Sequence, residues 1–205
     1  METTNAPFER RFTNEIEIRQ DAGRPPRVTG YAAVWDVWSH DLGGFREIVR
    51  RGAFTRSLAP GGNDVVALQQ HEQGRPVARR SIGTLRLHED SHGLAVDFEP
   101  LDTSAGRDML TEIRSGVVGS FSFGFKPAEN GSRWNFDTDP AERELLDLDL
   151  FEVSPATIPA FDGTIAEVRS LALAQQVRQA DNAPTALAHR LAWMKRRARL
   201  HQLTK

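Results

Sequence analysis

Two serines in one short alternating stretch are the first residues of this sequence that could act as nucleophiles. The stretch GVVGSFSFGF occupies residues 116–125, and Ser120 and Ser122 alternate in it with phenylalanines. Successive side chains of a strand point to opposite faces, so a strand here has one phenylalanine face and one face of serine and glycine. The phenylalanine face predicts burial in a core. The other face is explained either as small polar filling or as room for a reactive hydroxyl and its substrate.

A serine hydroxyl attacks a carbonyl only where a base takes its proton and a third group orients that base. The most common arrangement, G-x-S-x-G at a turn from strand to helix, requires a spacing that residues 119–124 miss. The segment that follows, KPAENG, is typical of a loop. These features exclude an α/β-hydrolase and leave a serine set into a β-strand as the candidate nucleophile.

His71 and Glu152 are the candidates for the base and for the group that orients it. His71 follows the strand pattern of residues 65–70 and opens onto a polar loop, where a rigid scaffold commonly holds functional side chains. Glu152 interrupts an apolar stretch, so its carboxylate must be exposed, paired with an arginine or used to orient another side chain. Taken alone, His71 also fits the pattern of an exposed histidine at the end of a strand, and Glu152 also fits a structural ion pair with an arginine.

The composition is typical of a globular protein and indicates no cofactor. The 205 residues suffice for one domain with a core, 39% are hydrophobic and 26% charged, and the net charge of -2 does not favour nucleic acid. The chain has no cysteine, which excludes thiolate metal sites, and no run approaches the ~18 apolar residues of a membrane span. We expect neither a cofactor nor a metal, and we expect the protein to stay in the cytoplasm in which it is made.

Short strands dominate the predicted secondary structure. Residues 81–101 predict a hairpin with the turn EDSHG, and residues 103–116 predict a helix with Thr103 or Ser104 as its N-cap and Gly116 after its C-terminus. Further strands are expected at 14–20, 27–39, 45–49, 64–72, 120–125 and 143–157, a short helix at 52–58 and a polar loop at 126–142.

This pattern predicts a mainly β protein with peripheral helices: a small antiparallel β-barrel with one internal helix and a helical C-terminal tail. We place the barrel domain at residues 1–170 and the tail at residues 171–205, which ends in the purely basic segment HRLAWMKRRARLHQLTK. The tail can bind a partner or pack on the barrel as an amphipathic helix, and we favour a partner-binding tail.

Four segments in a fixed order resemble the HK97-type prohead (capsid maturation) protease family of tailed phages. They are GYAAVWD with FREIVRRGAF (30–54), VVALQQHE through GLAVDFEPLDT (65–103), IRSGVVGSFSFGF (113–125) and LDLFEVSPATIPAFDGTIAEV (148–168). Each motif is modest alone, but the order of a histidine before IGTL, GLAV, the serine strand and then EVS is specific. The resemblance covers residues 12–170.

The resemblance implies a serine endopeptidase with a fold akin to that of the herpesvirus maturation proteases (assemblins). Matched residue by residue, it puts the family's histidine at His71, its S-x-G-F serine at Ser122 and its acidic third member at Glu152. Ser120 shares a strand face with Ser122, so periodicity does not separate the two and only the motif favours Ser122. The implied reaction is acyl transfer, in which His71 takes the proton of Ser122 and Glu152 stabilises the imidazolium.

The same resemblance implies a biological setting. Members of the family act during virion assembly, inside the immature procapsid of a phage or of a phage-derived particle such as a gene transfer agent. The implied partners are the major capsid protein with its scaffolding segment and the enzyme itself through autoproteolysis, and a homo-oligomer is a further option. Neither nucleic acid nor a membrane is expected as a partner, and the expected location is the assembling procapsid in the host cytoplasm.

Two other classes of function fit parts of the sequence. A non-enzymatic capsid-associated β-barrel, serving as an adaptor or binding module, would use the acidic segment 137–152 and the basic tail, and would not need the three site residues to meet. A glycosidase with paired carboxylates would take its acids from the same segment, but tryptophans that could stack on sugars are few. The combined motifs favour the serine protease.

Overall fold

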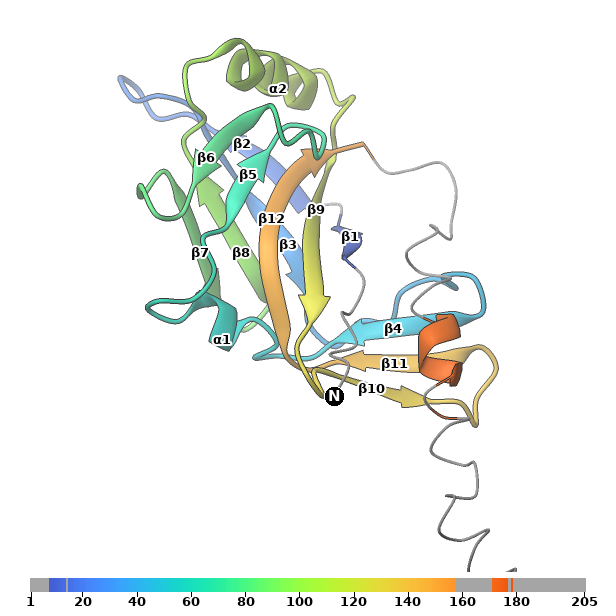
Figure 1. Ribbon diagram of the computed structural model, residues 1–205. Helices are drawn as coiled ribbons and strands as arrows, with labels where there is room; N and C mark the ends of the chain where they lie inside the picture. Colours follow the sequence, from blue (N-terminus) through green and yellow to red (C-terminus); the bar gives the residue numbers. More distant parts are fainter. Residues whose placement is uncertain (1–7, 14, 158–170, 177, 179–205) are drawn as a thin grey trace, which may run out of the picture.

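Within the described residues, the fold has three β-sheets, the helices α1 and α2, and a short helical segment at residues 171–176 (Figure 1). The computed structural model describes residues 8–13, 15–157, 171–176 and 178. The five-stranded sheet has the order β1 (Glu9–Thr13), β9 (Ser120–Pro127), β12 (Leu148–Ala156), β5 (Val66–Leu68) and β6 (Pro76–Arg79). The four-stranded sheet has the order β2 (Glu15–Arg19), β3 (Arg27–Val34), β8 (Gly93–Phe98) and β7 (Leu85–Glu89). The three-stranded sheet has the order β10 (Ser132–Asn135), β11 (Ala141–Leu145) and β4 (Phe45–Val49), and the helices are α1 (Thr55–Leu58) and α2 (Ser104–Arg114).

The hydrophobic core lies between the five-stranded and four-stranded sheets. The three phenylalanines of β9 are each at most 1% exposed, as the alternation predicts. Phe121 meets Phe98 of β8 with ring centroids 6.4 Å apart, and Phe123 packs edge-on to Phe54 at 5.4 Å. Burying such a ring stabilises the fold by roughly 1.5–3 kcal/mol. The rings therefore anchor β9, and they fix the position of its opposite face, which carries the serines.

The sheets do not close into the predicted antiparallel β-barrel. Among the described residues, the edge strands β6 and β7 form no ladder with each other. The chain passes from one large sheet to the other between β1 and β2 and between β6 and β7, so these consecutive strands belong to separate ladders. Two pairings are also parallel, β12 with β5 and β11 with β4. The mainly β class with few helices is confirmed, and the closed barrel is not.

The predicted hairpin and internal helix are both present. β7 and β8 pair antiparallel over the expected residues. The side chain of Thr103 caps α2 by accepting a hydrogen bond from the backbone N–H of Gly106 at 3.2 Å. Gly116 follows the helix with a φ of 77°, the left-handed conformation that ends many helices.

The segment between the serine strand and β12 differs from the prediction. The expected loop at 126–142 contains β10 and the start of β11, and the expected single strand at 143–157 is two strands in different sheets. The break falls at Leu146 and Asp147, whose backbone N–H groups donate to the Gly131 carbonyl at 2.8 and 3.1 Å. A Cβ on Gly131 would lie 2.1 Å from the Asp147 carbonyl oxygen, so the close approach depends on glycine. Leucine alternation continues through the break and hides it.

Hydrophobic alternation does not predict β1, because charged side chains occupy its buried face. Arg143 donates to Glu9 at 2.6 and 2.9 Å, and Arg11 donates to Glu9 at 2.8 Å and to Glu47 at 2.9 Å. All four residues are at most 8% exposed. This cluster ties β1 to the three-stranded sheet, and Arg10 and Phe12 on the other face of β1 remain free to reach the site described below.

The predicted helical tail lies only partly within the described residues. Residues 171–176 and 178 have helical backbone and lie beside the three-stranded sheet (Figure 1). Arg178 stacks over the ring of Phe136 at 5.0 Å and approaches Asp137 at 3.4 Å. The predicted domain boundary at residue 170 and the basic segment 189–205 lie outside the described residues. Within the described part of the chain, no helix is long and apolar enough to cross a membrane.

Candidate active site

A tight loop brings His71 to the side of β12. His71 lies in the connection from β5 to β6, which runs beside the end of β12 (Figure 1). Gln70 and His71 both have left-handed backbone, with φ of 51° and 64°, a conformation that costs energy for residues other than glycine. The Gln70 N–H donates to the Pro155 carbonyl at 3.2 Å, and the Gln70 side-chain oxygen accepts from the Thr157 N–H at 3.1 Å. These bonds attach the turn to β12, and the left-handed backbone directs the imidazole towards that strand.

The imidazole of His71 is hydrogen-bonded to the carboxylate of Glu152. Nδ1 lies 2.8 Å from Oε1 and 3.1 Å from Oε2. The side chains are 14% and 6% exposed, so the pair is nearly enclosed. Because an ionised carboxylate only accepts hydrogen bonds, the contact requires a proton on Nδ1 and leaves Nε2 of the neutral ring as an acceptor. Two of the three predicted site residues therefore meet in the orientation expected of a general base and the carboxylate that orients it.

Two further donors hold the same carboxylate. Arg10 Nε donates to Oε1 at 2.8 Å, and Ser154 Oγ donates to Oε2 at 2.5 Å. Burial alone would raise the pKa of Glu152, but the hydrogen bonds from His71, Ser154 and Arg10 outweigh it and lower the pKa below its ordinary value. Glu152 is therefore ionised at neutral pH despite its burial. It both pairs with an arginine and orients another side chain.

Gly124 of β9 provides the space that this carboxylate occupies. It lies opposite Glu152 in one ladder and opposite Arg10 in the other. A Cβ at this position would lie 2.6 Å from Glu152 Cγ, 2.8 Å from Glu152 Oε1 and 2.4 Å from the ring of Phe8. The glycine on the serine face thus accommodates the protein's own side chains.

Ser122 lies between two residues that contact the His71–Glu152 pair. Its partner on β1 is Phe12, whose ring packs edge-on to the His71 ring with centroids 5.9 Å apart. Its partner on β12 is Ser154, which donates to Glu152. Directly opposed residues of an antiparallel ladder share one face of the sheet. The fold therefore places Ser122 on the face that carries Glu152 and receives His71.

The hydroxyls of the two candidate serines have different environments. Both residues are fully buried, and Ser120 Oγ donates to the Ala156 carbonyl at 2.6 Å. Ser122 Oγ has no hydrogen-bond partner among the described residues, and neither has His71 Nε2, so the two are not hydrogen-bonded to each other. Four other buried side-chain atoms of the described residues also lack a partner, namely Thr29 Oγ1, Arg46 Nε, Gln69 Oε1 and Arg143 Nε, but none of these belongs to a hydroxyl and a base on one face. Here a hydroxyl and an imidazole nitrogen on one face are both uncommitted, and such groups can perform base-assisted nucleophilic chemistry.

Sequence reasoning missed Arg10 and Ser154. Arg10 belongs to the unpredicted β1, where the spacing in ERRF that puts Arg10 and Phe12 on one face was the available signal. Ser154 lies two residues from Glu152, a spacing that places both side chains on one face of a strand. Neither spacing indicates which carboxylate oxygen each residue contacts.

The acidic segment 137–152 does not present a free pair of carboxylates. Glu142 pairs with Arg46 at 2.6 Å, and Asp147 and Asp149 pair with Arg56 at 2.9 and 2.7 Å. These arginine pairs are structural, and they weaken the glycosidase hypothesis.

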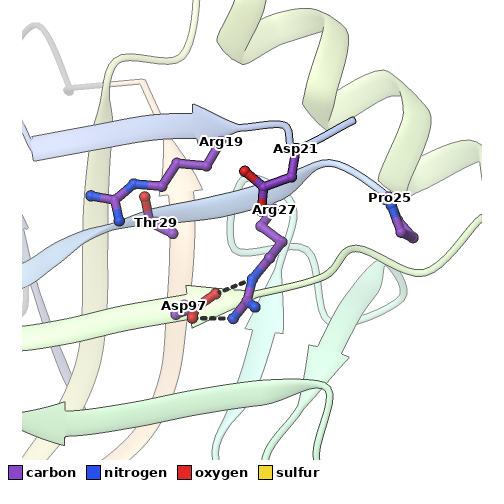
Figure 2. Close-up of a pocket in the computed structure, with 6 residues that line it drawn as sticks. All are labelled: Arg19, Asp21, Pro25, Arg27, Thr29 and Asp97. Carbon is purple, nitrogen blue, oxygen red and sulfur yellow. Dashed lines mark hydrogen bonds and ion pairs between the residues drawn. The ribbon is translucent and has the colours of Figure 1, made fainter. Parts of the chain in front are cut away.

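A hollow of about 260 Å³ lies away from the site, on the outer face of the four-stranded sheet (Figure 2). Its lining residues are Arg19, Asp21, Pro25, Arg27, Thr29 and Asp97. Arg27 Nε donates to Asp97 Oδ1 at 2.8 Å across the hollow. None of the three predicted site residues lines it.

Comparison with known proteins gives a family but no individual relative. Searches of the curated proteins and of the solved structures found no match to this chain. The model of one family, described as caudovirus prohead serine protease, matches residues 14–179 and so spans His71, Ser122 and Glu152. This match covers most of the chain and confirms the resemblance seen in its motifs. The chain belongs to the caudovirus prohead serine protease family.

Proposed function

We propose that this protein is an endopeptidase in which Ser122 is the nucleophile, His71 the general base and Glu152 the group that orients and stabilises the imidazole. The main support is the pair of uncommitted buried atoms, Ser122 Oγ and His71 Nε2, on the face where Glu152 holds the other imidazole nitrogen. Leaving a buried polar atom unpaired costs roughly 1–3 kcal/mol. Two such atoms on one face are better explained by chemistry than by packing.

In the proposed reaction, Ser122 Oγ attacks the carbonyl carbon of the scissile peptide bond while its proton moves to His71 Nε2. The Glu152 carboxylate, already bound to Nδ1, stabilises the imidazolium. The C–N bond then breaks, the imidazolium proton passes to the leaving amine, and Ser122 remains as an ester. A water molecule gives a proton to Nε2 and attacks the ester, and collapse returns that proton to Ser122 Oγ and releases the acid product.

The hydrogen bond between Ser122 and His71 forms when substrate binds. Catalytic hydrogen bonds are often long in free enzymes and tighten in the complex. A serine side chain has three staggered positions, so rotation moves the Ser122 hydroxyl across this face. Because Ser122 is fully buried, a neighbouring side chain must move to admit a peptide. The half-buried Phe12, which faces both Ser122 and His71, is suited to this.

Membership of the family supports a proposal about the substrates. A prohead protease acts on capsid proteins, and we propose that this one removes the scaffolding segment of the major capsid protein inside the assembling procapsid. We also propose that it cleaves itself, with loss of the tail that begins near residue 171. A homo-oligomer within the procapsid is compatible with this role.

Intact mass over time tests the proposal in the assembled particle. Wild-type chain, Ser122→Ala and Ser120→Ala are each expressed with the capsid protein, and both proteins are weighed. We expect trimming of the capsid protein and of the tail with wild type and Ser120→Ala, and none with Ser122→Ala. Trimming by Ser122→Ala would exclude Ser122 as the nucleophile. Absence of trimming in every case, procapsids included, would favour the non-enzymatic adaptor.

Labelling with a fluorophosphonate tests the nucleophile without knowledge of the cleavage site. An activated serine displaces fluoride from phosphorus and keeps the phosphonyl group, so the mass of the chain increases. We expect one adduct, located on Ser122 by peptide mapping, and none on Ser120, whose hydroxyl is bound to the Ala156 carbonyl. An adduct on Ser120 would reverse the assignment.

A further inference from the structure

We propose that Ser154 is a positioning residue that sets the orientation of the Glu152 carboxylate and, through it, of the His71 imidazole. This inference deepens the proposed function and rests on it. Ser154 lies two residues after Glu152 on β12 and is fully buried, and its Oγ donates to Glu152 Oε2 at 2.5 Å. An ionised carboxylate has no proton to give, so the hydroxyl is the donor.

Ser154 holds the carboxylate oxygen that the other donors hold least. Arg10 and His71 both approach Oε1 at 2.8 Å, whereas Oε2 receives His71 Nδ1 only at the longer distance of 3.1 Å. The terminal torsion of a glutamate side chain is broad, so a carboxylate fixed at one oxygen can still rotate. The Ser154 hydroxyl removes this freedom. The plane of the carboxylate then determines where the Nδ1–H group, and therefore Nε2, points.

Burial makes Ser154 a firmer support than Arg10. The Arg10 side chain is 41% exposed, so water competes with and screens its charge. Water does not reach Ser154, and a hydrogen bond to an ionised acceptor is strengthened in such surroundings. Ser154 is also the cross-strand partner of Ser122. The residue that fixes the carboxylate thus lies directly beside the proposed nucleophile.

Ser120 provides a matched control. It is a buried serine on the same face of the sheet, and its hydroxyl also makes one hydrogen bond, but to the backbone carbonyl of Ala156. Ser120→Ala and Ser154→Ala each remove one buried hydroxyl and one hydrogen bond. Only Ser154→Ala removes a bond to Glu152.

The first measurement is the rate at which a fluorophosphonate labels Ser122. We expect Ser154→Ala to lower this rate about 10- to 100-fold, as loss of a bond to a charged acceptor implies, and Ser120→Ala to change it less than about threefold. In a Glu152→Ala background, which leaves Ser154 no side-chain acceptor at position 152, the Ser154→Ala change should have little further effect, because Ser154 acts through that carboxylate. Equal rates for the two serine variants, or additive losses in the double variant, would overturn the proposal.

Nitrogen-15 NMR of the histidines gives a readout that does not depend on catalysis. In the Ser122→Ala background, His71 signals are identified by their loss in a His71→Asn variant. We expect the neutral His71 ring to carry its proton on Nδ1 in this background, and adding Ser120→Ala should not change this. Adding Ser154→Ala should give a mixture of the two tautomers. An unchanged tautomer would contradict the positioning role. If Ser154→Ala does not fold, Ser154→Cys keeps the shape with a weaker donor and takes its place.

The two experiments separate this inference from the proposed function. Labelling that survives Ser122→Ala would refute the function, whatever Ser154 does. Labelling that is lost in Ser122→Ala but equal in Ser154→Ala and Ser120→Ala would leave the function standing and refute the role of Ser154.

Discussion

Replacing Gly124 by alanine tests the geometry of the site without altering any reactive group. The added Cβ would lie 2.6 Å from Glu152 Cγ, while ordinary contacts begin near 3.4 Å. Glu152 would therefore have to shift by roughly 0.8 Å, since van der Waals repulsion does not allow the overlap. If the carboxylate moves by this amount along the bond between His71 Nδ1 and Glu152 Oε1, the 2.8 Å distance becomes roughly 3.6 Å, which is no longer a hydrogen bond.

The expected loss follows from that broken bond. A hydrogen bond to a charged group contributes roughly 1.5–3 kcal/mol, so we expect Ser122 of the Gly124→Ala variant to react with a fluorophosphonate about 10- to 100-fold more slowly than in wild type. The backbone of Gly124 is not left-handed, so the methyl group rather than backbone strain causes the effect.

Gly119→Ala is the matched control for this prediction. Gly119 directly precedes β9, and a Cβ on it would meet no atom of the described structure within 4 Å. Both variants are labelled under identical conditions, and thermal unfolding confirms that each is folded. A folded Gly124→Ala protein that is labelled as fast as Gly119→Ala would refute the reasoning, because Glu152 would then not need its present position.

Three further predictions concern charge. Glu152→Gln removes a charge that lies 2.8 Å from His71 Nδ1 and is partly offset by Arg10, so we expect labelling of the serine to fall by roughly 10²- to 10⁴-fold, measured at neutral pH. The lowered pKa of Glu152 means that its pairing stabilises the fold above the ordinary carboxyl pKa, and that this stabilisation is lost as the pH falls through the lowered value. Urea unfolding should therefore show wild type more stable than Glu152→Gln at about pH 7, with the difference shrinking at about pH 3, and a constant difference would contradict the assignment. Arg143→Met leaves the buried Glu9 carboxylate short of a partner, and we expect it to lower the free energy of unfolding by roughly 3–5 kcal/mol, read from the urea midpoint.

The elements that the sequence predicted well are those with local signals. Thr103 and Gly116 mark the two ends of α2, because capping and the left-handed C-terminal residue involve neighbours in the chain. The serine strand was predicted because alternation is a property of consecutive residues. β1 was missed because its buried face holds Glu9 and Arg11, whose partners lie far along the chain.

The assignment of strands to sheets was harder to predict than the strands themselves. The leucine pattern continues across Leu146 and Asp147 although the chain changes sheet there, because both sheets bury one face and alternation does not identify which. The closed barrel was expected because alternation likewise does not show which strands pair with each other. Closure would require ladders both between β1 and β2 and between β6 and β7, and hydrogen bonds between strands leave no periodic signal in the sequence.

Motifs in the sequence by themselves identified the family and selected His71, Ser122 and Glu152 as candidates, because a family's residue order is a property of the chain. Strand periodicity did not separate Ser120 from Ser122, which have the same parity on one strand, and only the motif favoured Ser122. The tertiary structure binds the Ser120 hydroxyl to the Ala156 carbonyl and leaves the Ser122 hydroxyl without a partner among the described residues, and it brings Arg10 and Ser154 to the two oxygens of Glu152. Residues as far apart in the chain as His71 and Glu152 meet only once the β5–β6 loop packs against β12. The partner of each hydrogen-bonding atom in the site is therefore determined by tertiary packing, and no local sequence pattern specifies it.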